Sequence, residues 1–523
     1  MEIYKNCPVN PYQVSTDSKS TPFANLNYTN QDFWSLKTRL VKFCQERYGP
    51  SGNLLPNSFN DFVESDLAIM LIENFAFVGD MLSFKMDQIV GEGGIDTVTQ
   101  LDNAFRLAKL VGFNPLPPIS ATSMWSATLP GISPVDVVVT TPIPVHLTSN
   151  NQPITIELFA ADANNKPLLN SPIIIPAGSV INNSVIGLEG TTVRSPFTGN
   201  GLVSQTYTLA GHVIYDSVQV QVDGTTWQRV DSFTDSQPRQ EYRVEFDSNW
   251  NAYVIFGNGR AGFIPSQGSQ IACRFRQGGG TNGNIVTGIA SSQVMVSVIG
   301  IANMIPVSFT NYSRGQNGYD GDGIEDIRRK LPAWIATQDR AVSGSDYKTF
   351  ADQFATPYHG QIGKSVAVLR NQGCAGNIID LYVLANNGGI LETASNGLKV
   401  DLLDALNDVK MLTDFVCIKD GSIVSVDIGI TATLNKFYKN YQDDIRQDIV
   451  NKTNAFFSIN NWEYGQPLRS IDLVKALSSI TQVESFEITF HLPANSNLQT
   501  EVYAKFYEII RPDTGVPISV NFI

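Results

Sequence analysis

Residues 253–288 restrict the fold of this chain more than any other stretch, because they combine strand-like alternation with a dense set of glycines. Two runs of alternating apolar residues, at 253–256 and 271–275, flank a segment that contains the pattern G-x-G-x-x-G, formed by Gly257, Gly259 and Gly262. Directly after a strand, this pattern can mark a dinucleotide-binding site, in which a helix begins at the third glycine and holds the pyrophosphate.

The residues after the third glycine disfavour a dinucleotide site. Pro265 and Gly268 follow, and the period of two then resumes, which is typical of a strand and not of a helix. We therefore predict a β-hairpin whose tight turn uses glycines at positive φ.

A second glycine cluster, at 278–284, has the glycine spacing of a phosphate-binding loop. It contains Gly279, Gly280 and Gly283, but Asn284 stands where the lysine of such a loop belongs. No side chain there can reach a β- or γ-phosphate, so we predict no cofactor at this cluster either.

Composition narrows the class of protein. A length of 523 residues suggests about three to four domains. The 41 glycines and 26 prolines predict many turns and therefore substantial β structure. The net charge of −13 disfavours nucleic acid as a partner, because no block of Lys and Arg supplies a phosphate-binding patch.

The cysteines and the N-terminus indicate where the chain folds. Five scattered cysteines without a C-x-x-C pair predict buried free thiols in a reducing compartment, and neither disulfides nor a zinc site. The N-terminus lacks the apolar segment of a signal peptide. No apolar run approaches the roughly 18 residues of a membrane span, so we expect folding in a cytoplasm and no membrane insertion.

Helical periodicity predicts a helical domain over residues 1–115. Thr29 and Asp32 resemble the capping box of a first helix, and further helices are expected at about 66–90 and 97–111.

The helix at 66–90 is apolar around most of its circumference, so it must be covered on several sides. The cover comes either from its own domain, which is the default interpretation, or from a partner helix. The candidate residues of a partner-helix interface are Leu67, Leu71, Phe75, Val78, Leu82 and Phe84.

The rest of the chain predicts sheets, first alone and then with helices. Residues 116–312 read as an antiparallel β domain with an insertion at about 160–215, and the candidate strands lie at 135–140, 154–159, 218–222, 242–246 and 253–256. Two small α/β domains of sandwich-like build follow, at 313–420 and at 421–523, the latter with an extended tail. The predicted fold class is α+β, multidomain.

Candidate chemistry is sparse. Asp320 and Asp322 resemble the start of a calcium loop, but the later ligand positions lack oxygen donors. The four histidines lie far apart, and an ion pair between Arg340 and Asp346 is expected to be structural. A carboxylate pair of the glycosidase kind remains open, but we predict no catalytic residue, no metal site and no cofactor.

Several blocks of the sequence, in order, resemble the baseplate J-like proteins of contractile phage tails. The blocks are Asp66–Phe77, Val254–Gly268, Arg274–Ile285, Gly318–Arg328, Arg340–Tyr347, Tyr464–Leu473 and Ile480–Phe486. The resemblance is weak at about 130–215 and 492–523. It implies a structural role for Gly257, Gly259, Gly262, Pro265, Gly268, Gly279, Gly280, Gly283, Asn284, Arg340, Asp346 and Tyr347.

The resemblance also implies a place in a virion. Such proteins are baseplate wedge subunits, assembled in the cytoplasm of the host bacterium, that form a ring around the central hub. The implied partners are a second copy of the chain, other wedge proteins, and sheath-initiating and hub-proximal baseplate proteins. The ring rearranges on host attachment, and sheath contraction begins.

Two alternatives stay open. One is a baseplate component of a related contractile injection system, either a tailocin or a type VI secretion system. The other is a glycan-binding or glycan-degrading tail protein, which requires aromatic residues and carboxylates that converge in one groove.

Overall fold

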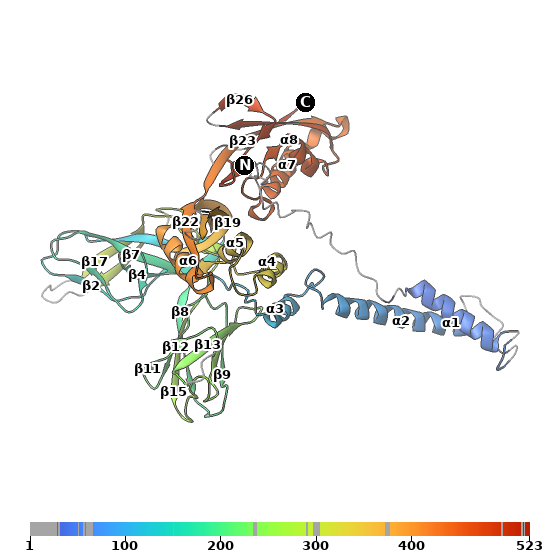
Figure 1. Cartoon of the computed structure of the whole chain (residues 1–523), viewed down its shortest axis with the longest axis horizontal. Helices are drawn as coiled ribbons and strands as arrows, with labels where there is room; N and C mark the ends of the chain where they lie inside the picture. The colour runs from blue at the N-terminus through green and yellow to red at the C-terminus, as the bar shows by residue number, and fades with distance from the viewer. Residues whose placement is uncertain are drawn as a thin grey trace, which may run out of the picture. The chain divides into compact units, whose positions relative to one another are not determined.

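The structure is a computed structural model that describes residues 29, 32–50, 52–55, 58, 66–149, 151–233, 238–288, 291–296, 304–371, 377–492, 495–513, 516 and 518–523. The chain is an α+β multidomain protein, as predicted: helices come first, antiparallel sheets follow, and helices return beside the later sheets (Figure 1). It divides into two compact units, Met1–Asn114 with Gly323–Arg329, and Pro115–Asp322 with Lys330–Ile523. The finer division into four domains stays a prediction.

The first unit is built from α1 (Phe33–Tyr48), α2 (Leu67–Gly91) and α3 (Leu101–Leu110), as the periodicity predicts. The predicted capping box at Thr29 and Asp32 is wrong. Asp32 does cap α1, but its partner is Ser35, whose backbone N–H donates to the carboxylate at 2.8 Å. Thr29 donates from its backbone N and its hydroxyl to the carboxylate of Asp87 on α2 instead.

A seven-stranded sheet opens the second unit. Its path runs β16-β17-β1-β7-β4-β3, with β5 beside β4. The bounds are β1 (Thr122–Thr128), β3 (Ile143–Ser149), β4 (Gln152–Ala161), β5 (Pro167–Leu168), β7 (Ile181–Glu189), β16 (Ser291–Val296) and β17 (Ile305–Asn311). A two-stranded sheet of β2 (Val137–Val139) and β6 (Ile173–Ile175) shares one apolar core with it, centred on Trp125.

Two four-stranded sheets enclose a second core. One has the order β11-β10-β15-β8 and the other β12-β13-β14-β9. The bounds are β8 (Thr191–Thr198), β9 (Thr206–Leu209), β10 (Gln219–Val222), β11 (Thr225–Thr226), β12 (Gln228–Arg229), β13 (Glu241–Phe246), β14 (Ala252–Phe256) and β15 (Gln270–Gln277).

This arrangement corrects two expectations. β14 and β15 do not form a hairpin, because β14 pairs with β13 and β9 while β15 pairs with β10 and β8. The glycine segment between them therefore carries the chain from one sheet to the other. The expected insertion at 160–215 instead supplies β7 to the seven-stranded sheet and β8 and β9 to the two smaller sheets.

Two mixed sheets with helices complete the chain, close to the predicted elements. The first contains β18 (Ala355–Thr356), β19 (Gly360–Asn371), β20 (Asn377–Asn387), β21 (Ile390–Thr393) and β22 (Asp414–Asp420), with α5 (Gly344–Asp352) and α6 (Asn396–Val409). The second contains β23 (Ser422–Leu434), β25 (Val483–Leu492), β26 (Asn495–Gln499), β28 (Glu508–Pro512) and β29 (Ser519–Phe522), with α7 (Gln442–Phe456) and α8 (Ser470–Leu477).

Short elements connect these parts. β24 (Leu468–Arg469) pairs with β27 (Glu501–Val502), and α4 spans Ile324–Thr337. Single 3-10 turns lie at η1 (Thr281–Gly283), η3 (Lys436–Tyr441) and η4 (Ile459–Asn461).

Candidate interaction surface

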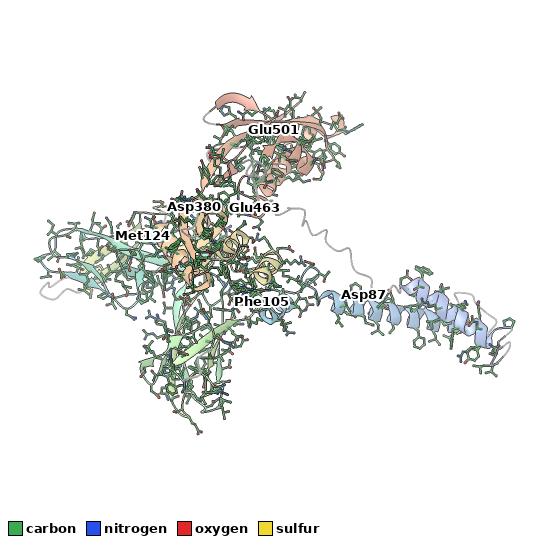
Figure 2. The ribbon with its side chains drawn as sticks, viewed as in Figure 1. Asp87, Phe105, Met124, Asp380, Glu463 and Glu501 are labelled. Carbon is green, nitrogen blue, oxygen red and sulfur yellow. The ribbon has the colours of Figure 1, made fainter. Side chains whose placement is uncertain are left out.

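Helix α2 is the centre of the candidate surface, and α1 covers one side of it. The two helices lie side by side and antiparallel (Figure 1). Lys37 of α1 contacts Glu73 near the start of α2 at 2.6 Å, whereas Thr29 contacts Asp87, labelled in Figure 2, near its end. Leu36 packs directly against Gly79, where a Cβ would come within 2.9 Å of the leucine side chain.

The covered side of α2 is defined by its buried residues, Ile69, Ile72, Ala76 and Ser83. At about 100° per residue, these positions fall within one narrow stripe that faces α1. α1 therefore accounts for only a fraction of the apolar circumference of α2.

Two further apolar stripes on α2 are exposed. Seam A consists of Leu67, Leu71, Phe75, Val78, Leu82 and Ile89, and seam B of Met70, Phe77, Met81 and Phe84. Both follow spacings of three, four and seven residues, which are the spacings of helix-packing positions. The α1-facing stripe, seam A and seam B lie about 120° apart around the helix axis.

The sequence prediction placed Phe84 together with the seam A residues, but helical geometry separates them. Phe75 on seam A is 69% exposed and Phe84 on seam B is 66% exposed. The sequence shows that the residues of seam B are apolar. It does not show that they are exposed, because exposure depends on what packs against the helix. Among the described residues, the chain itself covers only the α1-facing stripe of α2.

A membrane is a poorer match for this surface than protein. α2 is long and apolar enough to cross a bilayer by length and composition, with a mean hydropathy of 1.6, which corrects the expectation that no stretch reaches that length. Glu73 and Asp80 interrupt the apolar run, but the mean hydropathy of the helix stays high enough for a membrane span. However, α1 packs alongside and carries Lys37, Arg39, Lys42, Glu46 and Arg47, and a charged side chain at the bilayer centre costs about 2.5–3.5 kcal/mol or more.

The first glycine motif shapes the backbone of the crossing between β14 and β15. Gly259 and Gly262 have φ values of 84° and 74°, as predicted for glycines at positive φ. At Gly257 a Cβ would collide with the backbone of Gly262. The side chain of Asn258 accepts hydrogen bonds from the backbone N of Arg260 and Ala261, both at 2.9 Å, so these groups are used within the loop.

The two remaining motif positions of this segment are also structural. The carbonyl of Pro265 accepts a hydrogen bond of 2.7 Å from the buried side chain of Gln205. Gly268 has a φ of 84° and its backbone N donates to the carbonyl of Gly199.

The second glycine cluster cradles carboxylates that belong to the chain. Gly278, Gly279 and Gly280 have φ values of 129°, 86° and 122°. The backbone N of Gly279 donates to Glu189 Oε2 at 2.6 Å, and that of Thr281 donates to Asp320 Oδ1 at 2.9 Å. The backbone N–H groups that would hold a phosphate in such a loop are therefore already used, those of Gly279 and Thr281 by carboxyl groups of the chain and those of Gly278 and Gly280 by the carbonyls of His212 and Ile119.

Glu189 is buried beside Gly283, where a Cβ would meet its side chain at 2.7 Å. Burial raises the pKa of Glu189 to about 7, although the hydrogen bond from Gly279 and the charge of Arg276 oppose the rise. Desolvation of the charged form outweighs both.

Arg276 anchors the same region and was not anticipated from the sequence. Its guanidinium pairs with the buried carboxylate of Glu157 on β4 and donates to the carbonyls of Leu188 and Glu189, each at 3.0 Å. The strand alternation of β15 was the only sign in the sequence that Arg276 is buried. Its partner Glu157 could not be found from the sequence, because it lies more than a hundred residues away.

The remaining motif residues hold neighbouring segments together. Asn284 Oδ1 accepts from the backbone N of Gly318 at 3.0 Å, and the Tyr347 hydroxyl donates to Asp414 Oδ2 at 2.9 Å. The predicted Arg340–Asp346 ion pair is wrong: Asp346 forms a capping box with Ser343 at the start of α5, and Arg340 donates to the side chain of Gln338. The carboxylate of Asp346 is thus already used by the helix cap.

The described residues offer little room for a small-molecule ligand. A cavity of about 150 Å3 lies among Thr122, His359 and Asn387, below the roughly 300 Å3 at which small-molecule sites begin. In the part of the chain that the structure describes, no three His, Cys, Asp or Glu side chains are grouped to hold a metal ion. The apolar surface of α2 is therefore the strongest candidate site.

Comparison with known proteins points to the same region. Residues 45–110 match the family described as bacteriophage baseplate protein, N-terminal domain. The match covers the end of α1 and all of α2 and α3. No curated protein matches the chain in sequence.

Two solved structures are similar at low scores. One is a chain of the anti-feeding prophage (AFP) baseplate, with 11% identity and a TM-score of 0.38 over 92% of this chain and 98% of that chain. The other is a chain of the type VI secretion system TssK–TssF–TssG baseplate subcomplex, with 10% identity and a TM-score of 0.29 over 68% of this chain and 96% of that chain. At these scores neither structure defines the fold of this chain.

Proposed function

We propose that this protein is a structural subunit of the baseplate wedge of a contractile phage tail and that α2 is its main assembly surface. The similarity of residues 45–110 to the N-terminal domain of baseplate proteins supports the baseplate role. The observation that carries the assembly role is the exposure of seam A and seam B on a helix that the described residues cover on one side.

The two seams favour helical partners. A helix that is apolar on three sides is stable in water only when neighbours cover all three. Full burial of one large apolar side chain contributes about 1.5–3 kcal/mol, so covering both seams gives association a large driving force. Glu73 already interacts with Lys37 on α1, and Asp87 with Thr29, which precedes α1, so these two carboxylates do not oppose docking.

We assign one seam to a second copy of this chain and the other to another wedge protein. The resulting helical bundle joins subunits into wedges, and wedges form a ring at the tail baseplate of the virion. Contacts with sheath-initiating and hub-proximal proteins then pass the rearrangement on host attachment to the sheath. A tailocin or a type VI secretion system would use the same surface, so the proposal extends to related contractile injection systems.

The proposed role is non-enzymatic. The glycines at 257–268 and 278–284 are used for backbone geometry and for internal carboxylates, which supports a structural role for the motif residues. The glycan-degrading alternative has no comparable observation in its favour.

Size measurement of the purified chain, alone and mixed with candidate wedge proteins, tests the proposal. We expect light scattering to show a stable complex that contains this chain. The double variant Phe75→Asp and Phe84→Asp places one charge on each seam, and should remain folded but lose the complex. The control Lys42→Glu changes an exposed charge on α1 and should leave assembly intact.

Two outcomes would count against the proposal. One is a chain that stays monomeric with every candidate wedge protein. The other is a double variant that assembles as well as the unmodified chain.

A further inference from the structure

A cluster of four charged side chains lies where residues 421–523 meet the preceding α/β segment, residues 330–420. Lys348 of α5 contacts Asp352 at 2.6 Å and Glu463 at 3.4 Å. Lys364 of β19 pairs with the other oxygen of Glu463 (Glu463 is labelled in Figure 2). Glu463 is thus the single member from the C-terminal side, and it bridges two lysines from the other side.

The positive and negative charges of the cluster are equal in number only when Glu463 is in place. Lys364 is buried, and Lys348, Asp352 and Glu463 are partly buried. With Glu463 the two cations face two carboxylates; without it two lysines share Asp352 alone. A buried cation that loses its partner is strongly destabilising, because its desolvation is no longer compensated.

The pKa shifts of Lys364 and Glu463 agree with a dependence of Lys364 on the charge of Glu463. Burial lowers the pKa of Lys364, and nearby Lys348 adds to the effect. Burial alone would raise the pKa of Glu463, but Lys348 and Lys364 outweigh it and lower the pKa. Glu463 is therefore held in the charged form that Lys364 requires.

The chain crosses between the two segments at a single glycine. Gly421 separates β22 from β23, and a Cβ there would collide with the hydroxyl of Tyr464, the neighbour of Glu463. That hydroxyl is buried without a hydrogen-bond partner, so its contact with Gly421 is close but not bonded.

A stacked aromatic pair supports the same boundary. The rings of Tyr382 on β20 and Tyr507 lie 5.6 Å apart, and the backbone N of Ser422 donates to the carbonyl of Tyr507 at 2.9 Å. The backbone N of Gly421 donates to the carbonyl of Val383 at 3.0 Å. The Gly421 amide therefore bonds across the boundary and reports on whether it is closed, whereas the Ser422 amide bonds within residues 421–523.

We propose that Gly421 is a pivot and that Glu463, bridging Lys348 and Lys364, is the latch that fixes residues 421–523 on residues 330–420. Withdrawal of Glu463 leaves Lys364 without its counter-charge, and opening also withdraws Leu384 and Leu391 from the apolar core that they share with residues 421–523. A discrete step therefore separates the latched arrangement from an open one. Such a step suits a two-state element better than gradual bending does. The latch does not depend on the α2 surface or on its partners.

Hydrogen exchange of the full-length chain tests the latch at the backbone amide of Gly421. In Glu463→Gln, which keeps the shape and removes the charge, we expect this amide to exchange about tenfold faster or more. Glu157→Gln is the matched control, because it removes a buried carboxylate that pairs with Arg276 in a different sheet. It should leave exchange at the Gly421 amide within about twofold of the unmodified chain.

The double variant Lys364→Met with Glu463→Gln separates the latch from general stability. It removes the unpaired buried lysine, so its unfolding midpoint should return toward that of the unmodified chain while exchange at the Gly421 amide stays fast. It also carries the test if Glu463→Gln alone does not fold. Unchanged exchange at the Gly421 amide in Glu463→Gln or in the double variant, or equal acceleration in Glu157→Gln, would overturn the proposal.

Discussion

Glycine positions in this chain illustrate how one residue type serves two purposes. Gly259 and Gly262 provide positive φ for the crossing between two sheets. Gly279 instead presents its backbone N–H to Glu189, in a loop of three consecutive positive-φ glycines whose other two N–H groups donate to the carbonyls of His212 and Ile119. The second loop thus resembles a phosphate loop in its glycine spacing, and it holds a carboxyl group of the chain itself through one glycine amide.

Glu189→Gln should change the dependence of stability on pH. The pKa of Glu189 is raised from 4.5 to about 7 in the folded protein, so the folded state binds the proton more tightly. Its stabilising contribution is complete below pH 4.5 and is lost as the pH rises through about 7, and the difference amounts to about 3 kcal/mol. The variant cannot titrate there and should therefore gain stability relative to the unmodified chain between pH 4.5 and pH 8.

Unfolding midpoints of both proteins across this pH range measure the effect. The exposed Glu484, changed to Gln, serves as control and should produce a nearly constant difference. A constant difference for Glu189→Gln as well would contradict the prediction.

Helix α2 shows what periodicity alone leaves open. Its spacing predicted a long helix that is apolar on most sides, and the structure has that helix at Leu67–Gly91. Which stripe faces its own chain was decided by α1, which lies along Ile69, Ile72 and Ala76. The two remaining stripes could only be separated once this contact was known.

Single charges on each seam should therefore remove different partners. Phe75→Asp affects seam A and Phe84→Asp affects seam B, and each should abolish one contact while the other persists. Cross-linking mass spectrometry of the assembled wedge with either variant distinguishes loss of self-contacts from loss of contacts to another wedge protein. Simultaneous loss of both contacts in each variant would show that the seams act as one surface.

At the scale of the whole molecule, an exposed apolar helix is combined with a net charge of −13. The charge keeps separate copies apart through long-range repulsion, whereas burial of the seams favours association at short range. Salt screens the repulsion between copies and leaves the attraction from apolar burial largely intact.

We therefore expect the isolated chain to associate more strongly as salt rises from about 50 to 500 mM, because the Debye length falls from above 10 Å to a few ångströms. Sedimentation velocity at several protein concentrations measures the average mass. The Phe75→Asp and Phe84→Asp double variant should stay monomeric throughout. Dissociation of the unmodified chain by salt would indicate association through ion pairs instead.

The sequence by itself determined the fold class, the helices at α1 to α3, and nearly every strand and helix of residues 362–490, because these depend on local periodicity and caps. It also predicted the positive φ of Gly259 and Gly262. It failed at Thr29, at Arg340 with Asp346, and at the supposed hairpin of β14 and β15. In each case the deciding partner lies elsewhere in the chain or competes for the same polar group.

Only the tertiary structure decided which side of α2 remains open, how the 160–215 segment joins the sheets, and which charges meet. Arg276 with Glu157, and Glu463 with Lys364, are pairs of residues about a hundred positions apart in sequence. Sequence periodicity records whether a side chain prefers to be buried, but not against what. Burial partners are set by the packing of whole elements, so the assembly surface and the latch became visible only when the elements were placed.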